Sequence, residues 1–285
     1  MKNKMARLVL ILLAVAVICL SVGTVILLAN NGAGDRFAEE QNVNKELLFN
    51  SGEVRSLKIE CVSNTIRFHE TETDTIRFHL TGSHAGPDDD LLTLESELKN
   101  GELVVRVKRK PVVMSFFYYE SVGLDIYLPK MAFKHLDIET TSADLDAQFL
   151  RASEFSYQTT SGSIHIGTLE ADKTEIETVS GDAIINTITG GLQFESVSGQ
   201  INARFEALTD DITMATTSGS ARITLPADSE FQLDTSSVSG SVFCDFPLLG
   251  KYRDQNDREW SAVVGSGGVK ITWESISGDL ELLTR

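Results

Sequence analysis

Basic residues, cysteines and histidines are all scarce in this sequence of 285 residues. Lysine and arginine number 25 against 41 aspartates and glutamates, a formal charge of −16, and an acidic surface of this kind repels nucleic acids and anionic lipids. The three cysteines and five histidines follow no spacing typical of a zinc site. We therefore exclude nucleic acid as a partner, and we expect neither a metal nor another cofactor.

One long stretch near the N-terminus has no charge at all. Residues 8–29, "LVLILLAVAVICLSVGTVILLA", would span roughly 33 Å as a helix, enough to cross a bilayer, and the stretch is longer than the apolar region of a cleaved signal peptide. Lys2, Lys4 and Arg7 precede it and acidic residues follow it. The positive-inside rule then predicts a transmembrane helix with residues 1–7 in the cytoplasm and the C-terminal domain outside the cell membrane.

The rest of the chain repeats a Ser-Gly pair, as in "ETVSGDAIINT". A β-branched residue precedes each serine, a small hydroxyl residue stands two positions before it, and apolar residues alternate on both sides. This alternation predicts a strand, a corner and a second strand in every unit, with the glycine giving a sharp bend. Six glycines occupy the corner position: Gly162, Gly181, Gly199, Gly219, Gly240 and Gly278.

The repeat has a nearly fixed period of about 19 residues, which is typical of stacked units. We predict an all-β fold, a single-stranded parallel β-solenoid of about 19-residue coils, preceded by the transmembrane helix. Each strand would lie on its equivalent in the next coil, about 4.8 Å away. An antiparallel sandwich is the alternative, but it does not explain why identical columns recur in the same direction.

The domain organisation follows from where the repeat is strong. Residues 30–45 are predicted as a linker, 46–120 as an irregular β cap, and 121–285 as the solenoid. Within the cap, the duplicated "TIRFHETETDTIRFHL" is predicted as a hairpin. Asn64 and Ala143 replace the corner glycine in two weaker copies of the repeat.

The two cysteines in this region, Cys61 and Cys244, occupy columns of small or apolar residues, so we interpret both as packing residues. A disulfide between them stays open as an alternative for a domain outside the cell.

The serines do not resemble catalytic serines. No Gly-x-Ser-x-Gly elbow is present and no His-Asp partner recurs beside them, whereas a nucleophile is needed only once. We therefore expect a protein that is not an enzyme. The alternative is a carbohydrate-active solenoid enzyme of the cell envelope, which could use the acidic residues that share one outward column: Glu139, Glu177, Glu195 and Glu274.

The rhythm fails in one place, the insert 245–268, which fills a double-length step in the repeat. Its aromatic residues and arginines are a mixture enriched in protein interfaces, so it could bind a partner. Alternatively, it could cover the open end of the rod and hide an exposed strand edge. The candidate partner-binding residues are Tyr252, Arg253, Arg258 and Trp260.

The "TVSGD" and "TTSGS" units, the "ITLPADSEF" corner and the closing "GSGGVKITWESISGDLEL" resemble a bacterial β-strand-repeat family of unknown function, labelled "putative adhesin", to which LiaG-like envelope proteins belong. The resemblance covers about residues 50 to 285. It implies a membrane-attached envelope protein, in some relatives linked to envelope-stress operons, and it supplies no catalytic residues. The expected partner is an envelope protein or a polysaccharide, not identified further.

Overall fold

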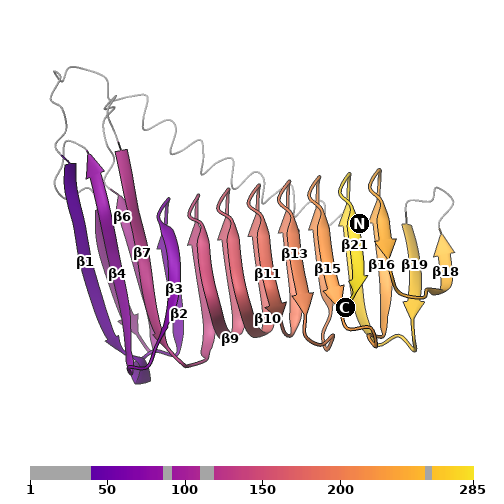
Figure 1. Ribbon diagram of the computed structural model, residues 1–285, viewed down its shortest axis with the longest axis horizontal. Helices are drawn as coiled ribbons and strands as arrows, with labels where there is room; N and C mark the ends of the chain where they lie inside the picture. The colour runs from indigo at the N-terminus through magenta and orange to yellow at the C-terminus, as the bar shows by residue number, and fades with distance from the viewer. Residues whose placement is uncertain (1–39, 86–91, 110–118, 254–258) are drawn as a thin grey trace, which may run out of the picture.

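The computed structural model describes residues 40–85, 92–109, 119–253 and 259–285. They form one 21-stranded sheet that winds into an elongated rod (Figure 1). Between the strands of these ranges lies one short 3-10 helix, η1 (Ser51–Glu53). The all-β class expected from the sequence is therefore confirmed.

The strands at the N-terminal end of the rod are β1 (Glu40–Asn50), β2 (Ser56–Cys61), β3 (Thr65–Thr71), β4 (Thr75–Ala85), β5 (Leu92–Lys99), β6 (Glu102–Arg109) and β7 (Tyr119–Pro129). The middle of the rod contains β8 (Phe133–Thr140), β9 (Leu145–Thr159), β10 (Ile164–Thr178), β11 (Ala183–Ile188), β12 (Gly191–Ser196), β13 (Ile201–Phe205), β14 (Ile212–Thr216) and β15 (Ala221–Leu225). The remaining strands are β16 (Phe231–Ser237), β17 (Val242–Cys244), β18 (Leu249–Arg253), β19 (Glu259–Val264), β20 (Val269–Ser275) and β21 (Leu280–Thr284).

The predicted transmembrane segment, residues 8–29, lies outside the described residues, as do residues 1–7. Within the described ranges, no helix is both long and apolar enough to cross a membrane. The strand β1 begins at Glu40, so regular structure starts inside the segment predicted as a linker, 30–45.

Two faces enclose the core of the rod. Strands downstream of the Ser-Gly corners form the downstream face, in the order β1, β4, β7, β3, β9, β10, β11, β13, β15, β21, β17. Strands upstream of the corners form the upstream face, in the order β5, β6, β2, β8, β9, β10, β12, β14, β20, β16, β19, β18. The long strands β9 and β10 contribute their first halves to one face and their second halves to the other.

Equivalent residues of successive repeats lie side by side in parallel register. Ile164 of β10 pairs with Ala183 of β11, and Ile201 of β13 pairs with Ala221 of β15. All four point inward and are almost fully buried. Complete burial of a large apolar side chain is worth about 1.5–3 kcal/mol. The inward columns read from the sequence therefore form the core of the structure.

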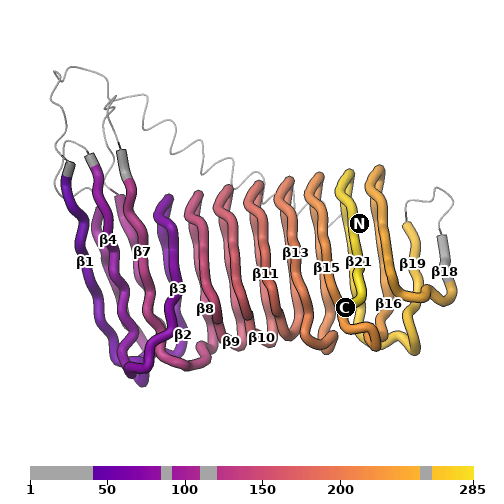
Figure 2. Tube along the Cα trace, viewed as in Figure 1, coloured from indigo at the N-terminus to yellow at the C-terminus, as the bar shows by residue number. Residues whose placement is uncertain are grey.

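The coils do not stack in the order of the sequence. The last coil, β20 and β21, lies between the coil of β14 and β15 and the coil of β16 and β17, as the yellow strand between orange strands shows (Figure 2). In the core, Trp273 of β20 lies between Met214 of β14 and Thr235 of β16. The prediction that each strand lies on its equivalent in the next coil of the sequence is therefore wrong at this end of the rod.

The path of the chain explains this insertion. β19 pairs antiparallel with one edge of β16, and β20 pairs parallel with the other edge. The turn between them crosses the start of β16, where Ser266 donates a hydrogen bond to Glu230. Gly265, Gly267 and Gly268 have positive φ in this turn. Both edges of β16 are thereby paired, and the C-terminal coil has neighbours on both sides.

The N-terminal end has the same kind of insertion. β2 lies between β6 and β8, and β3 lies between β7 and β9. The hairpin predicted for 65–80 is wrong, because β7 separates β3 from β4 and pairs with both. The first coil of the predicted cap, 46–120, is therefore part of the same stack as the strands of the predicted solenoid, 121–285.

Antiparallel pairs close both ends of the rod. They join β1 to β4, β4 to β7 and β5 to β6 at one end, and β19 to β16 and β18 at the other. The fold is thus β-solenoid-like, with mixed ends around a parallel middle.

The two described cysteines are both free, so the disulfide left open by the sequence is not formed. Cys61 lies on β2 near one end of the stack and Cys244 lies on β17 at the other. Burial raises the pKa of the Cys61 thiol to about 12 and also raises that of Cys244. Both side chains contact the core, in agreement with a packing role.

Candidate functional site

The hydroxyl groups at the corners hold the backbone of the stack. The amide of Gly181 donates to Thr178 Oγ1 at 2.8 Å, and the amide of Gly199 donates to Ser196 Oγ at 2.6 Å. The corner serines themselves reach the preceding coil, as Ser198 Oγ does in donating to the carbonyl of Val179 at 3.2 Å. These hydroxyls thus satisfy backbone groups that a sharp corner would otherwise leave unpaired.

The corner glycines are required by close approach and not by an unusual φ. None of the six, all of which are described, has a positive φ. A Cβ on Gly181 would lie 1.9 Å from the carbonyl oxygen of Gly162, and one on Gly278 would lie 1.7 Å from that of Gly219. The chain bends at these corners as predicted, and the reason for glycine is steric, because successive corners touch through their backbones.

The described part of the insert 245–268 covers the end of the rod. Phe246 is 4% exposed and packs edge-on against Phe231, with ring centroids 5.2 Å apart. Ala262 and Val264 of β19 are buried as well. The capping interpretation therefore holds for these residues, which replace solvent at the open end of the core.

The four candidate partner-binding residues are only partly described. Trp260 packs against the core, and its carbonyl accepts a hydrogen bond from Thr235 Oγ1 at 3.2 Å. The backbones of Tyr252 and Arg253 pair with β19. Arg258 and the side chains of Tyr252 and Arg253 lie outside the described residues, so partner binding by this group stays a prediction.

The outward acidic column of the upstream face is interrupted. Glu139 forms an ion pair with Lys58 of the first coil. Glu177 and Glu195 are direct neighbours on β10 and β12, but Ala215 of β14 follows them in register. Burial, and then the charges of Glu195 and Glu175, raise the pKa of Glu177. The column thus brings carboxylates together in pairs, Glu60 beside Glu139 and Glu177 beside Glu195, and not in one continuous row.

The histidines that the sequence duplicates in β3 and β4 are engaged separately. His69 Nε2 lies 2.8 Å from Asp125 Oδ1, and its ring stacks on Tyr127 at 4.8 Å between centroids. His79 Nε2 lies 2.9 Å from Asn44 Oδ1. In the described part of the chain, no three His, Cys, Asp or Glu side chains are grouped in a way that could hold a metal ion.

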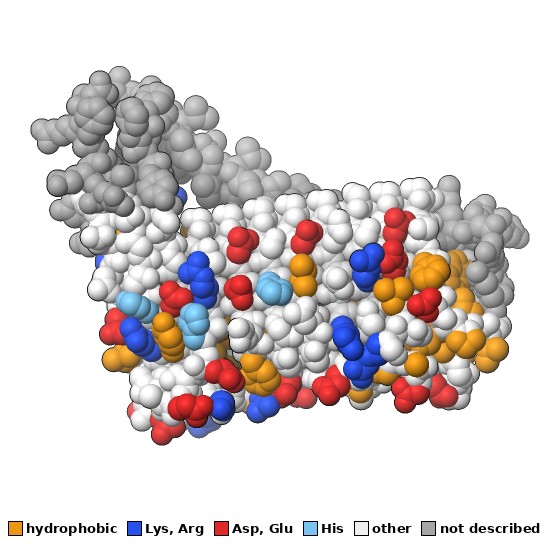
Figure 3. Space-filling view, in the orientation of Figure 1, with side chains coloured by type: hydrophobic (Ala, Val, Ile, Leu, Met, Phe, Trp, Pro, Cys, Tyr) orange, Lys and Arg blue, Asp and Glu red, His pale blue; other side chains and the backbone are white. Residues whose placement is uncertain are grey.

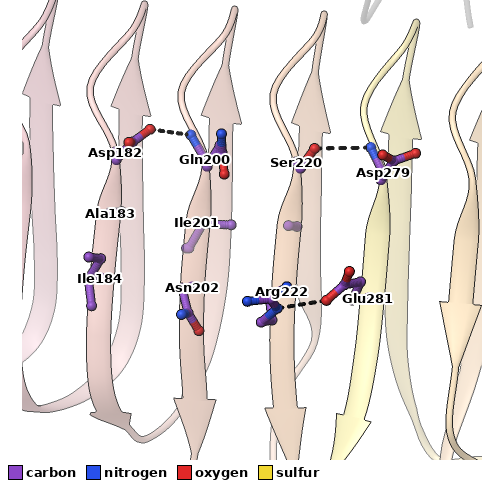
Figure 4. A pocket seen from close by; sticks show the side chains of 11 residues that line it. Asp182, Ala183, Ile184, Gln200, Ile201, Asn202, Ser220, Arg222, Asp279 and Glu281 are labelled. Carbon is purple, nitrogen blue, oxygen red and sulfur yellow. Dashed lines mark hydrogen bonds and ion pairs between the residues drawn. The ribbon is translucent and has the colours of Figure 1, made fainter.

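The downstream face carries a feature that the sequence did not reveal. Acidic and basic side chains are interspersed along this face, and apolar ones gather toward the end that carries β18 and β19 (Figure 3). On this face a shallow groove of about 370 Å³ crosses the outer side of β11, β13, β15 and β21. Its side chains stand in two rows across the strands (Figure 4). The upper row is Asp182, Gln200, Ser220 and Asp279, and the lower row is Ile184, Asn202, Arg222 and Glu281.

The upper row is fixed by hydrogen bonds from one coil to the next. The backbone N–H of Gln200 donates to Asp182 Oδ1 at 2.9 Å, and the backbone N–H of Asp279 donates to Ser220 Oγ at 3.3 Å. Asp279 Oδ1 in turn accepts from the backbone and hydroxyl of Ser241, at 2.8 and 2.7 Å. These two bonds lower the pKa of Asp279, the backbone bond first. These hydrogen bonds hold the carboxylate of Asp279 in place and favour its ionised form.

The lower row contains one ion pair, and one side-chain amide in each row makes no hydrogen bond to the described residues. Arg222 Nε lies 2.6 Å from Glu281 Oε2, across the contact between β15 and β21. The exposed side-chain amide of Asn202 makes no hydrogen bond to the described residues. The side-chain amide of Gln200, in the upper row, makes none to them either, although its backbone N–H does. The sequence could not have shown this arrangement, because it depends on β21 being inserted beside β15.

This rod of stacked strands, with hydroxyl and glycine corners, defines a class of β-solenoid-like repeat proteins. The family model Toastrack DUF4097 matches the chain twice, over residues 54–172 and 130–283. The chain therefore belongs to the Toastrack family, which agrees with the resemblance noted from its Ser-Gly units.

Several solved structures are similar in a looser sense. A "putative adhesin" from Parabacteroides distasonis has 13% identity and a TM-score of 0.45, with 85% of this chain and 97% of that chain covered. A "putative adhesin" from Bacteroides fragilis has the same identity and coverage with a TM-score of 0.42. A "putative cell adhesion protein" from Clostridium sporogenes has 11% identity and a TM-score of 0.31, over 85% of this chain and all of the other. No curated protein matches the chain.

Proposed function

We propose that this protein is a non-enzymatic component of the cell envelope, anchored in the membrane by residues 8–29, whose Toastrack rod contacts other envelope components outside the cytoplasm. It serves either as an adhesion module or as an accessory to stress sensing. In this proposal the parallel coils in the middle of the rod act as one β-solenoid, which holds its outer faces at a distance from the membrane.

The observation that carries the proposal is the structural use of the repeated hydroxyls. Thr178 and Ser196 accept hydrogen bonds from the corner amides of Gly181 and Gly199, and the pattern recurs from coil to coil. A hydrolase would need a reactive hydroxyl at one place, whereas here equivalent hydroxyls bind the backbone of the corner in successive repeats. What is left for function is the outward surface of a rigid rod, and rigid scaffolds commonly present binding surfaces in this way.

The charge of the chain supports the same conclusion. The excess of acidic residues keeps such a rod soluble and disfavours nucleic acids and anionic lipids as partners. Lys2, Lys4 and Arg7, which precede the apolar segment, support an orientation with the rod outside.

The proposal is tested by the topology of the full chain in intact cells. A short epitope placed after Arg285 is expected to react with antibody without permeabilisation, whereas the same epitope before Met1 is expected to react only after permeabilisation. The opposite pattern, or an epitope after Arg285 that is protected in intact cells, contradicts the proposal.

A further inference from the structure

We propose that the groove across β11, β13, β15 and β21 is a binding site for a linear polysaccharide that carries no anionic groups. The inference rests on the proposed function, because it names the class of envelope component that the rod contacts and the place where the contact occurs. The polysaccharide would lie along the rod, at right angles to the strands.

The polar groups of the groove are those that bind sugar hydroxyls. Carboxylate, amide and guanidinium groups each offer two acceptors or donors in one plane, which matches the paired hydroxyls of a sugar ring. The groove holds all three kinds, in Asp182, Asn202 and Arg222. The side-chain amides of Gln200 and Asn202 are exposed and make no hydrogen bond to any other described residue, so a ligand would not have to break such a bond to reach them.

The lower row begins with an exposed apolar residue, and a second one lies just beyond its other end. Ile184 on β11 is 44% exposed and Phe243 on β17 is 54% exposed, and Phe243 is the direct neighbour of Glu281 in register. The exposed ring of Phe243 offers a flat apolar surface. Since a sugar ring has an apolar face as well as polar edges, a row with hydrogen-bonding groups between two apolar contacts suits a chain of such rings.

The spacing of the rows favours an extended polymer. Neighbouring strands lie about 4.7–4.9 Å apart, so each row repeats at this interval along the rod. Four such steps separate β11 from β17, which places Ile184 and Phe243 about 19 Å apart. The spacing between neighbouring strands is close to the length of one pyranose unit, so consecutive units of an extended glycan can meet equivalent positions of consecutive coils.

The charge of the groove restricts the ligand further. Asp182, Asp279 and Glu281 contribute three negative charges, and Arg222 contributes one positive charge that Glu281 already neutralises. Uronic acid or phosphate polymers would meet uncompensated carboxylates on the rim. An uncharged or amino-bearing glycan would not, and amino groups would be attracted.

Isothermal titration calorimetry of the full chain in detergent tests the proposal with three hexasaccharides: an uncharged β-1,4-glucan, a β-1,4-glucosamine oligomer and a galacturonate oligomer. We expect heat of binding for the first two and a dissociation constant at least ten-fold weaker for the third. Preference for the galacturonate, or no binding of any of the three at millimolar concentration, overturns the proposal.

Three variants locate the site. Asn202→Leu removes the central amide and is expected to weaken binding of the preferred hexasaccharide at least ten-fold. Phe243→Ser removes the aromatic contact and is expected to weaken it about three-fold. Gln158→Leu makes the same amide-to-leucine change at an exposed outward position of β9 on the upstream face, and it is expected to leave binding unchanged. Equal loss in Gln158→Leu and Asn202→Leu, or unchanged binding in Asn202→Leu and Phe243→Ser, refutes the location.

A fold control keeps the test decisive. The melting temperature of each variant is compared with that of the parent, and if Asn202→Leu lowers it, Ile184→Ser at an exposed outward position takes its place. This experiment also separates the two proposals. Failure of hexasaccharide binding leaves the surface topology of the Arg285 epitope untouched, whereas an epitope found inside the cell refutes the envelope function without altering binding in solution.

Discussion

Thr216 and Ser275 lie 59 positions apart in the sequence, yet their side-chain oxygens are 3.2 Å apart in the hydroxyl column of the rod. This contact joins β14 to β20 and marks the place where the C-terminal coil enters the stack. The coil that precedes it in sequence, β16 and β17, lies on its far side. The C-terminus is therefore held by neighbours on both sides, and the end of the rod is covered by a hairpin.

The corner glycines can be tested at Gly181. Gly181→Ala is expected to destabilise the protein by about 1–3 kcal/mol, because its Cβ would overlap the carbonyl oxygen of Gly162 and the backbone must shift. Gly52→Ala is the matched control, since its Cβ would make only ordinary contact with Asn50. Chemical denaturation of both variants measures the difference. Equal stability of the two would contradict the steric account of the corners.

The capping role of the insert can be tested with two neighbouring phenylalanines. Phe246→Ala is expected to cost about 3–5 kcal/mol, since it empties a buried position against Phe231 at the end of the core. Phe243→Ala should cost far less, because that ring is 54% exposed. Urea unfolding curves provide the comparison. If Phe246→Ala unfolds at the same urea concentration as the parent, the insert does not cap the rod.

The paired glutamates predict a dependence on pH. The pKa of Glu177 is raised in the folded state by burial and by Glu195 and Glu175, so its charged form disfavours folding above that pKa and the cost disappears as the pH falls below the ordinary glutamate range. Glu177→Gln is therefore expected to raise the melting temperature at pH 7 and to leave it unchanged near pH 3.5.

Melting curves of the parent and the variant at both pH values measure this effect. Glu206→Gln, at an exposed position, controls for the general loss of a negative charge and should have little effect at either pH. A gain for Glu177→Gln that is equal at pH 3.5 and pH 7 would show that ionisation of Glu177 is not its cause.

The strands and corners of each repeat were predictable because they depend on residues close together in the sequence. Alternation around each Ser-Gly pair places residues such as Ile166 and Ile185 inward, and their equivalence predicts that they lie side by side, as they do. The hydroxyl two positions before each serine likewise predicts a corner hydrogen bond.

The order of the coils was not predictable, because the repeats are so alike. Equivalent columns fit any slot of the stack equally well, so nothing in the pattern around Trp273 says that its neighbours are Met214 and Thr235. The duplicated "TIRFH" segments suggested a local hairpin, whereas β7 arrives from a later part of the chain to separate them. The groove could not be foreseen either, because Glu281 reaches Arg222 only through the inserted coil.

Cysteine cross-linking measures the order of the coils most directly. Ala215 of β14 and Glu274 of β20 are direct neighbours in register and lie in an outward column, whereas sequential stacking would place Ala215 beside Ser236 of β16. The double variant Ala215→Cys/Glu274→Cys is compared under mild oxidation with Ala215→Cys/Ser236→Cys, and mass spectrometry of proteolytic fragments identifies the linked peptides against the parent chain. The inserted coil predicts an intramolecular disulfide in the first variant and none between the introduced cysteines of the second. A disulfide between residues 215 and 236, without one between 215 and 274, would contradict it.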